Sequence, residues 1–183
     1  MGGLDITAYS HMQAIGLHTK DPKLNEGEPC GIDDWCFYDD HFEVFAYADF
    51  PRSFRGFATV ATPNRGGGFI YAGCYQTTAD TVTHDFHAGS YGGYNRWRED
   101  LRNQFNPGHD PNGPFYELIW FADNEGSIGP EAAADLLVDF RTHADEYAGR
   151  HPHPGVDDWY KASYVDWTRA FELAADGGLV RFH

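Results

Sequence analysis

Three stretches in the second half of the chain carry apolar residues at the spacing of helical turns, and this periodicity constrains the fold most strongly. The first runs from near Gly93 to Phe105, the second from Pro130 to about Tyr147, and the third from Asp157 to the glycines at 177–178. Their stripes are Tyr94, Trp97, Leu101 and Phe105; Ala133, Leu136, Leu137, Phe140, Ala144 and Tyr147; and Tyr160, Tyr164, Trp167, Phe171 and Ala174. We therefore expect three helices, each burying one apolar face.

The remaining apolar runs are short and predict strands. They cover residues 4–15, 42–47, 69–75, 81–86, 115–121 and 179–182, with a possible bulge at Gly73. The run FYELIWF at 115–121 is the most apolar of them, so we expect it to be a central strand.

Strands and helices do not alternate regularly, so an α+β fold is favoured over a doubly wound sheet. The expected architecture is a single domain spanning 1–183, a mostly antiparallel sheet with about three helices packed on it. Residues 16–34 predict an exposed acidic loop, and residues 149–156 a linker between the last two helices, which we expect to pack as an antiparallel pair.

Composition narrows the class of protein. Aromatic residues make up 16% of the chain, which excludes intrinsic disorder. A net charge of −15 argues against direct binding to nucleic acid, since that requires a basic surface. No signal peptide, membrane-spanning run or basic amphipathic helix is evident, and three cysteines are too few for a disulfide framework. We expect a cytoplasmic protein that does not bind membranes.

The segment THDFHAGSYGGYNRWR at 83–98 has the highest density of functional groups. Its glycines lie between a predicted strand and a helix start, where free backbone N–H groups can bind an anion. Tyrosines add stacking faces and arginines add forked donors, so a small anionic or nucleotide-like ligand is the leading hypothesis. The predicted ligand-binding residues are His84, His87, Ser90, Tyr91, Tyr94, Asn95 and Arg98. The alternative is an ordinary strand–helix junction with Tyr94 in the core.

Several common catalytic motifs are missing from the sequence. No Gly-Lys-Ser/Thr follows the glycines, no G-x-G-x-x-G follows an early strand, and no G-x-S-x-G elbow is present. Nucleophilic catalysis therefore has little support, and a binding role is favoured over an enzymatic one.

A second segment, FADNEGSIGPE at 121–131, places Asp123, Asn124 and Glu125 directly after an apolar run. Such oxygen ligands could hold Mg²⁺, Mn²⁺ or Ca²⁺, with Asp123 and Glu125 as the predicted metal ligands. The alternative is a turn leading into the next helix. A metal-dependent hydrolase would also need His84 and His87, which on a strand point to opposite faces unless a turn begins at residue 86.

A third segment, residues 26–49, contains eight acidic residues and no Lys or Arg. Such a run is usually a solvated surface. It could instead act as an acidic nucleic-acid mimic for a basic protein partner.

Three strings, GLDITAYS, HDFHAGSYGGYNRWR and FADNEGSIGPE, resemble a family of proteins from actinobacteria and their phages. The resemblance brings no catalytic residue, cofactor or substrate with it. It implies a bacterial cytoplasmic setting and a phage accessory role, such as countering host defence by sequestering a signal.

The sequence thus leaves three functions open. The first is a binding module for a small anionic ligand, the second a divalent-metal-dependent hydrolase, and the third an acidic interaction protein.

Overall fold

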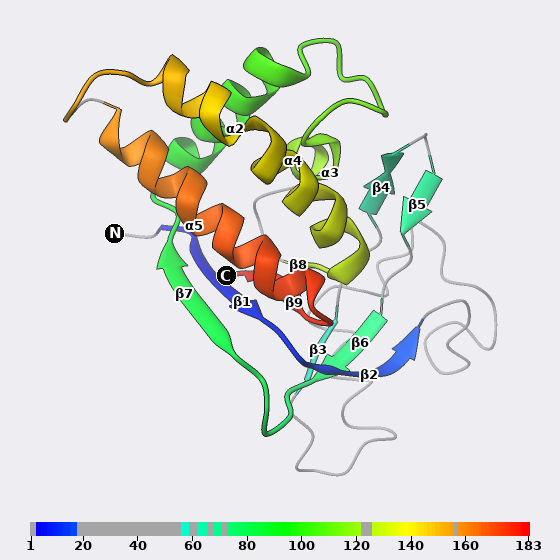
Figure 1. Ribbon diagram of the computed structural model, residues 1–183. Helices are drawn as coiled ribbons and strands as arrows, with labels where there is room; N and C mark the ends of the chain where they lie inside the picture. Colours follow the sequence, from blue (N-terminus) through cyan, green and yellow to red (C-terminus); the bar gives the residue numbers. More distant parts are fainter. Residues whose placement is uncertain are drawn as a thin grey trace.

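A computed structural model describes residues 3–17, 56–58, 62–65, 68–70, 73–121, 126–155 and 157–183 (Figure 1). The predicted strand at 42–47, most of the loop at 16–34 and the acidic segment 26–49 lie outside these ranges.

The main sheet has four antiparallel strands in the order β7-β1-β9-β8. They are β1 (Asp5–Tyr9), β7 (Thr83–His87), β8 (Gly126–Ile128) and β9 (Leu179–Phe182). β1 and β9 are neighbours, with Ile6 opposite Phe182 in the register. An antiparallel sheet carrying helices confirms the predicted α+β fold class, and β9 confirms the strand predicted at 179–182.

Two smaller sheets hold the remaining strands. They are formed by β2 (Gln13–Leu17), β3 (Gly56–Ala58) and β6 (Gly73–Gln76), and by β4 (Thr62–Asn64) and β5 (Gly68–Ile70). The run predicted as one strand at 4–15 is divided, because His11 between β1 and β2 has a left-handed φ of 52°. The irregular register lies in β2, between Ala14 and Gly16, and not at Gly73.

All three predicted long helices are present: α2 (Tyr91–Phe105), α4 (Pro130–Arg150) and α5 (Asp158–Ala175). α2 begins two residues earlier than predicted, and α4 continues three residues further. Asp157 occupies the N-cap position of α5, but its carboxylate accepts a hydrogen bond from the His153 amide rather than capping the helix. Gly177, with φ of 67°, follows the end of α5 as the two glycines predicted.

α4 and α5 pack against each other, with α5 lying across the main sheet (Figure 1). The Tyr164 hydroxyl donates to the Phe140 carbonyl at 2.8 Å, and Tyr164 stacks on Tyr147 at 4.3 Å between ring centroids. Arg141 near the middle of α4 reaches Glu172 near the end of α5, as the predicted antiparallel arrangement requires.

The prediction of a central strand at 115–121 is wrong. This run forms a short helix, α3 (Tyr116–Trp120), that begins after Phe115 in a left-handed conformation with φ of 58°. A short apolar run does not distinguish a buried strand from a buried helix. The one charged residue of α3, Glu117, is fully buried and is paired with Arg65, far away in the sequence.

Aromatic side chains from both the helices and the sheet meet around Trp167 of α5, which is 1% exposed. Its ring stacks on Trp97 of α2 at 5.6 Å and meets Phe86 of β7 edge-on at 5.2 Å. Phe182 of β9 lies at 5.5 Å from the same indole. One side chain therefore joins two helices to two strands.

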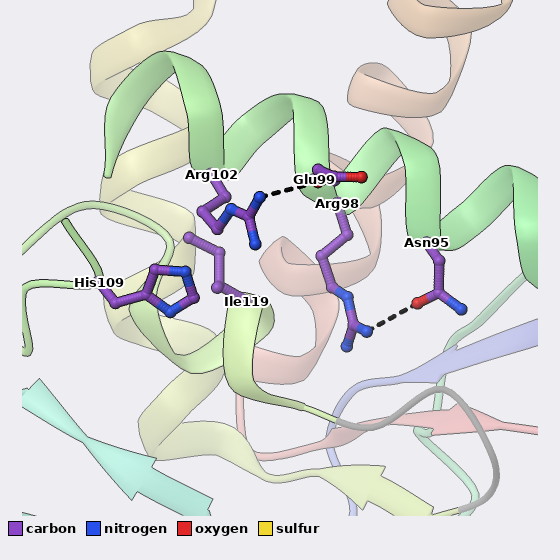
Figure 2. A pocket seen from close by; sticks show the side chains of 6 residues that line it. All are labelled: Asn95, Arg98, Glu99, Arg102, His109 and Ile119. Atoms are coloured by element: carbon purple, nitrogen blue, oxygen red, sulfur yellow. Dashed lines mark hydrogen bonds and ion pairs between the residues drawn. The ribbon is translucent and has the colours of Figure 1, made fainter. Parts of the chain in front are cut away.

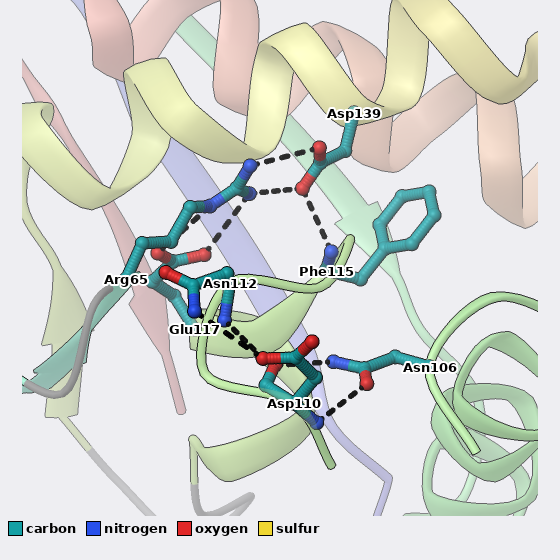
Figure 3. Close-up of polar contacts among 7 residues, drawn as sticks. All are labelled: Arg65, Asn106, Asp110, Asn112, Phe115, Glu117 and Asp139. Carbon is teal, nitrogen blue, oxygen red and sulfur yellow. Dashed lines mark hydrogen bonds and ion pairs between the residues drawn. The ribbon is translucent and has the colours of Figure 1, made fainter. Parts of the chain in front are cut away.

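α3 is held in place by a buried ion cluster of Arg65, Glu117 and Asp139 (Figure 3). Arg65, just after β4, donates to Glu117 at 3.2 and 3.3 Å and to both oxygens of Asp139. Asp139 of α4 also accepts from the Phe115 amide at 2.7 Å. Burial raises the pKa of Glu117 above its ordinary value, and the Arg65 hydrogen bonds offset this only in part.

We expect Trp167→Ala to lower the free energy of unfolding by about 3–5 kcal/mol, because it leaves a cavity among five aromatic rings, those of Phe86, Tyr94, Trp97, Phe171 and Phe182. Val165→Ala lies on the outer face of the same helix, where Val165 is 66% exposed, and should change stability by less than about 0.5 kcal/mol. Urea denaturation of both variants measures the difference. Equal effects would contradict the central role of Trp167.

Glu117→Gln should alter how stability depends on pH. A carboxyl whose pKa is raised on folding holds its proton more tightly in the native state than in the unfolded state. The free energy of unfolding therefore falls as the pH rises above 4.5, the ordinary pKa of a Glu side chain. The free energy of unfolding of the wild type minus that of the variant should therefore fall as the pH rises from the ordinary pKa of 4.5 through the raised pKa of the folded state. Glu131→Gln controls for the change in net charge. A difference that increases with pH would show that the Arg65 ion pair outweighs burial.

Candidate functional site

The two histidines of the predicted site lie on opposite faces of β7, which continues through His87 without a turn. His84 faces α5, where its Nε2 lies 3.6 Å from an Asp166 oxygen. His87 is more exposed, and its Nδ1 lies 2.8 Å from an Asp5 oxygen. They cannot bind one ligand together.

Ser90 and Tyr91 lie at the junction between β7 and α2, where the sequence predicts a junction from the glycines of segment 83–98. The Ser90 hydroxyl accepts from the Gly93 amide at 3.0 Å and so caps α2. Gly89 adopts φ of 96°, which favours glycine, and the exposed Trp159 lies close to it. Ser90 is thus used by the helix itself, whereas Tyr91 is 45% exposed.

Tyr94, one of the predicted ligand-binding residues, lies in the core and is 1% exposed, so its side chain is not open to a ligand. Its ring packs against Trp167 at 5.5 Å and Phe182 at 6.0 Å. Tyr94 still influences the site, because the Arg98 guanidinium lies over its ring at 5.3 Å from the centroid.

Asn95 and Arg98 open into a cleft of about 250 Å³ between α2, α3 and the loop that joins them (Figure 2). The cleft is lined by Asn95, Arg98, Glu99, Arg102, His109 and Ile119. The four residues from α2 follow a helical spacing that places them on one face, beside the buried stripe of Trp97 and Leu101.

Arg98 is fixed in orientation by neutral partners. One terminal nitrogen donates to the Phe121 carbonyl at the end of α3, and the other donates to the Asn95 side-chain oxygen at 2.7 Å. Because a guanidinium has five donors, these two bonds leave capacity for a ligand, and neither cancels the positive charge.

Arg102 lies one turn further along α2 and is paired with acidic Glu99 at 2.8 Å. Its side chain extends toward His109 and Ile119 (Figure 2). The Glu99 side chain is 58% exposed, so this ion pair is a weak surface contact. An anion in the cleft can therefore compete for Arg102.

The His109 ring is brought to the cleft by the loop after α2. Asn106, which is 3% exposed, accepts from the Asp110 amide at 2.7 Å and donates to the Asp110 carbonyl at 3.0 Å (Figure 3). The loop folds around the Asn106 side-chain amide, and His109 within it has a left-handed conformation with φ of 52°. Gly113 lies so close to the Asn106 side chain that a Cβ atom would come within 2.6 Å.

The metal and acidic-partner hypotheses concern other parts of the chain. Asp123, Glu125 and the segment 26–49 lie outside the described residues. Within the described ranges, no group of three or more His, Cys, Asp or Glu side chains is placed to hold a metal ion.

Sequence reasoning missed four cleft residues: Glu99, Arg102, His109 and Ile119. The α2 residues could have been found from their spacing, since positions 95, 98, 99 and 102 share a helix face. His109 and Ile119 could not, because their positions depend on the loop closure and on α3 being a helix.

Comparisons with known proteins yield no match among protein families, curated sequences or solved structures. None of the helices that the structure describes is long and apolar enough to cross a membrane.

Gly113→Ala should displace the Asn106 amide and loosen the loop that carries His109. We expect a loss of about 1–3 kcal/mol in the free energy of unfolding, the usual cost of an overpacked site. Gly108→Ala in the same loop is a matched control, since a Cβ there meets nothing within 4 Å. Denaturation curves and hydrogen exchange at the Asp110 amide measure the effect. Equal exchange in both variants would contradict it.

Proposed function

We propose that the chain is a binding module for a small anionic ligand and that the cleft formed by α2 and α3 is its binding site. The observation that carries the proposal is the pair of guanidinium groups, Arg98 and Arg102, on one wall of a cleft that contains a single carboxylate, Glu99. Forked guanidinium donors match phosphate and carboxylate oxygens in geometry and charge.

The two arginines have different parts in this proposal. Arg98 is already oriented by Asn95 and the Phe121 carbonyl, so little side-chain entropy is lost when it contacts an anion. Arg102 exchanges its surface contact with Glu99 for the ligand. His109 supplies a further hydrogen-bonding ring at the opposite wall.

The position of this site also fits the charge of the chain. With a net charge of −15, the protein repels anions at long range, and the favourable potential must come from groups in direct contact. Such a site suits a small ligand whose anionic group lies within the cleft. It does not suit a polyanion, because the net charge of the protein would repel the rest of such a ligand.

Arg102→Ala tests the proposal more cleanly than Arg98→Ala, because Arg98 also connects α2 to the end of α3. We expect Arg102→Ala to weaken binding of inorganic phosphate or adenosine monophosphate at least about tenfold, the usual effect of losing a charge-assisted hydrogen bond. Isothermal titration calorimetry measures the dissociation constants.

Arg169→Ala is the matched control, since Arg169 forms a comparable exposed pair with Glu172 on α5, away from the cleft. It removes the same charge and should leave binding unchanged. If neither ligand binds the wild type, or if both variants weaken binding equally, the cleft is not an anion site.

A further inference from the structure

We infer that the ligand of this cleft is a mononucleotide, with its phosphate between Arg98 and Arg102 and its base stacked on Trp120. This inference rests on the proposed function, to which it adds the ligand class and a specificity-determining residue. It is based on Trp120, whose ring contacts His109 at the cleft and has no part in the proposed binding of the anion.

Trp120 is the last residue of α3 and follows Ile119, which lines the cleft. It is 52% exposed, more than any other large aromatic side chain whose burial the structure describes. A single exposed apolar residue needs no explanation, but the Trp120 ring contacts the ring of His109, which lines the cleft together with Arg98 and Arg102. Its position is what suggests a ligand contact.

Two neighbouring rings hold the Trp120 indole in place. His109, which lines the cleft, lies at 5.9 Å with the ring planes at 82°, and Tyr116 lies at 6.2 Å with the planes at 65°. Both are edge-to-face contacts, so neither ring is stacked in parallel on the indole face. A rigid indole that is about half exposed is well suited to stack on a planar group.

The size of the cleft determines which part of the ligand it can enclose. At about 250 Å³ it is smaller than the roughly 300–1,000 Å³ of pockets that enclose a drug-sized molecule. It can take a phosphate and part of a sugar, while an attached base must lie outside, at the rim. His109 connects the cleft to Trp120, so the rim on that side offers an aromatic surface.

Stacking on Trp120 should contribute measurably to affinity. A base stacked on an aromatic side chain strengthens binding by roughly fivefold to a hundredfold. A sugar phosphate without a base would make the same contacts with Arg98 and Arg102 but would lack this gain. The ratio of the two affinities therefore isolates the contribution of Trp120.

The test compares adenosine monophosphate with ribose phosphate by calorimetry in the wild type, Trp120→Ala, Trp159→Ala and Arg102→Ala. We expect the nucleotide to bind about tenfold more tightly than the sugar phosphate in the wild type and in Trp159→Ala. Trp159 is a matched control, because it is 39% exposed and lies over Gly89 and Gly93 instead of the cleft. Trp120→Ala should bring the ratio close to one without weakening the sugar phosphate.

The remaining outcomes separate the two proposals. Equal affinities in the wild type, or a ratio that Trp120→Ala leaves unchanged, would overturn the nucleotide assignment while the anion site stands. No binding of either compound, or binding unaffected by Arg102→Ala, would overturn the anion site itself. An oligoadenylate with a terminal phosphate that binds more tightly than the mononucleotide would overturn the assignment to a free nucleotide.

Discussion

Packing around the Trp167 indole is the interaction on which the other elements depend. Trp97, Phe86 and Phe182 approach this one ring from α2, β7 and β9, and each brings a different element of the fold to the same point. Burying large aromatic rings supplies much of the driving force for folding in a domain of this size. Because α2 is fixed through Trp97, the adjoining face, with Arg98 and Arg102, takes a defined position beside α3. The orientation of the cleft thus follows from the core.

A second constraint is electrostatic and sets the position of α3. Two carboxylates, Glu117 and Asp139, are buried beside one another, which is tolerable only because Arg65 donates to both. Burial lowers the pKa of Arg65, but its hydrogen bonds to Asp139 and Glu117 more than reverse this, so the guanidinium stays charged. The cluster connects β4, α3 and α4, and α3 in turn carries Ile119 to the cleft.

The parts of the fold that were predictable are those whose signal is local. The apolar stripes through Trp97, Phe140 and Trp167 predicted the three long helices, because helical periodicity can be recognised within each segment alone. α3 was missed because a short apolar run does not distinguish a helix from a strand, and its one charged residue, Glu117, has its partner 52 residues earlier in the chain. The same limit applies to the site. Asn95 and Arg98 were found from one segment, but His109 reaches the cleft only through the loop that Asn106 closes.

The two arginines of the cleft also bear on which anion the proposed site prefers. Arg98 has neutral partners, so its charge is available before any ligand arrives. Arg102 is already paired with Glu99, and an incoming anion must displace that carboxylate. A ligand with one carboxylate would replace one such contact with another and gain little, whereas a phosphate has more charge and more acceptor oxygens. The pairing of Arg102 with Glu99 therefore favours phosphate over carboxylate at the proposed site.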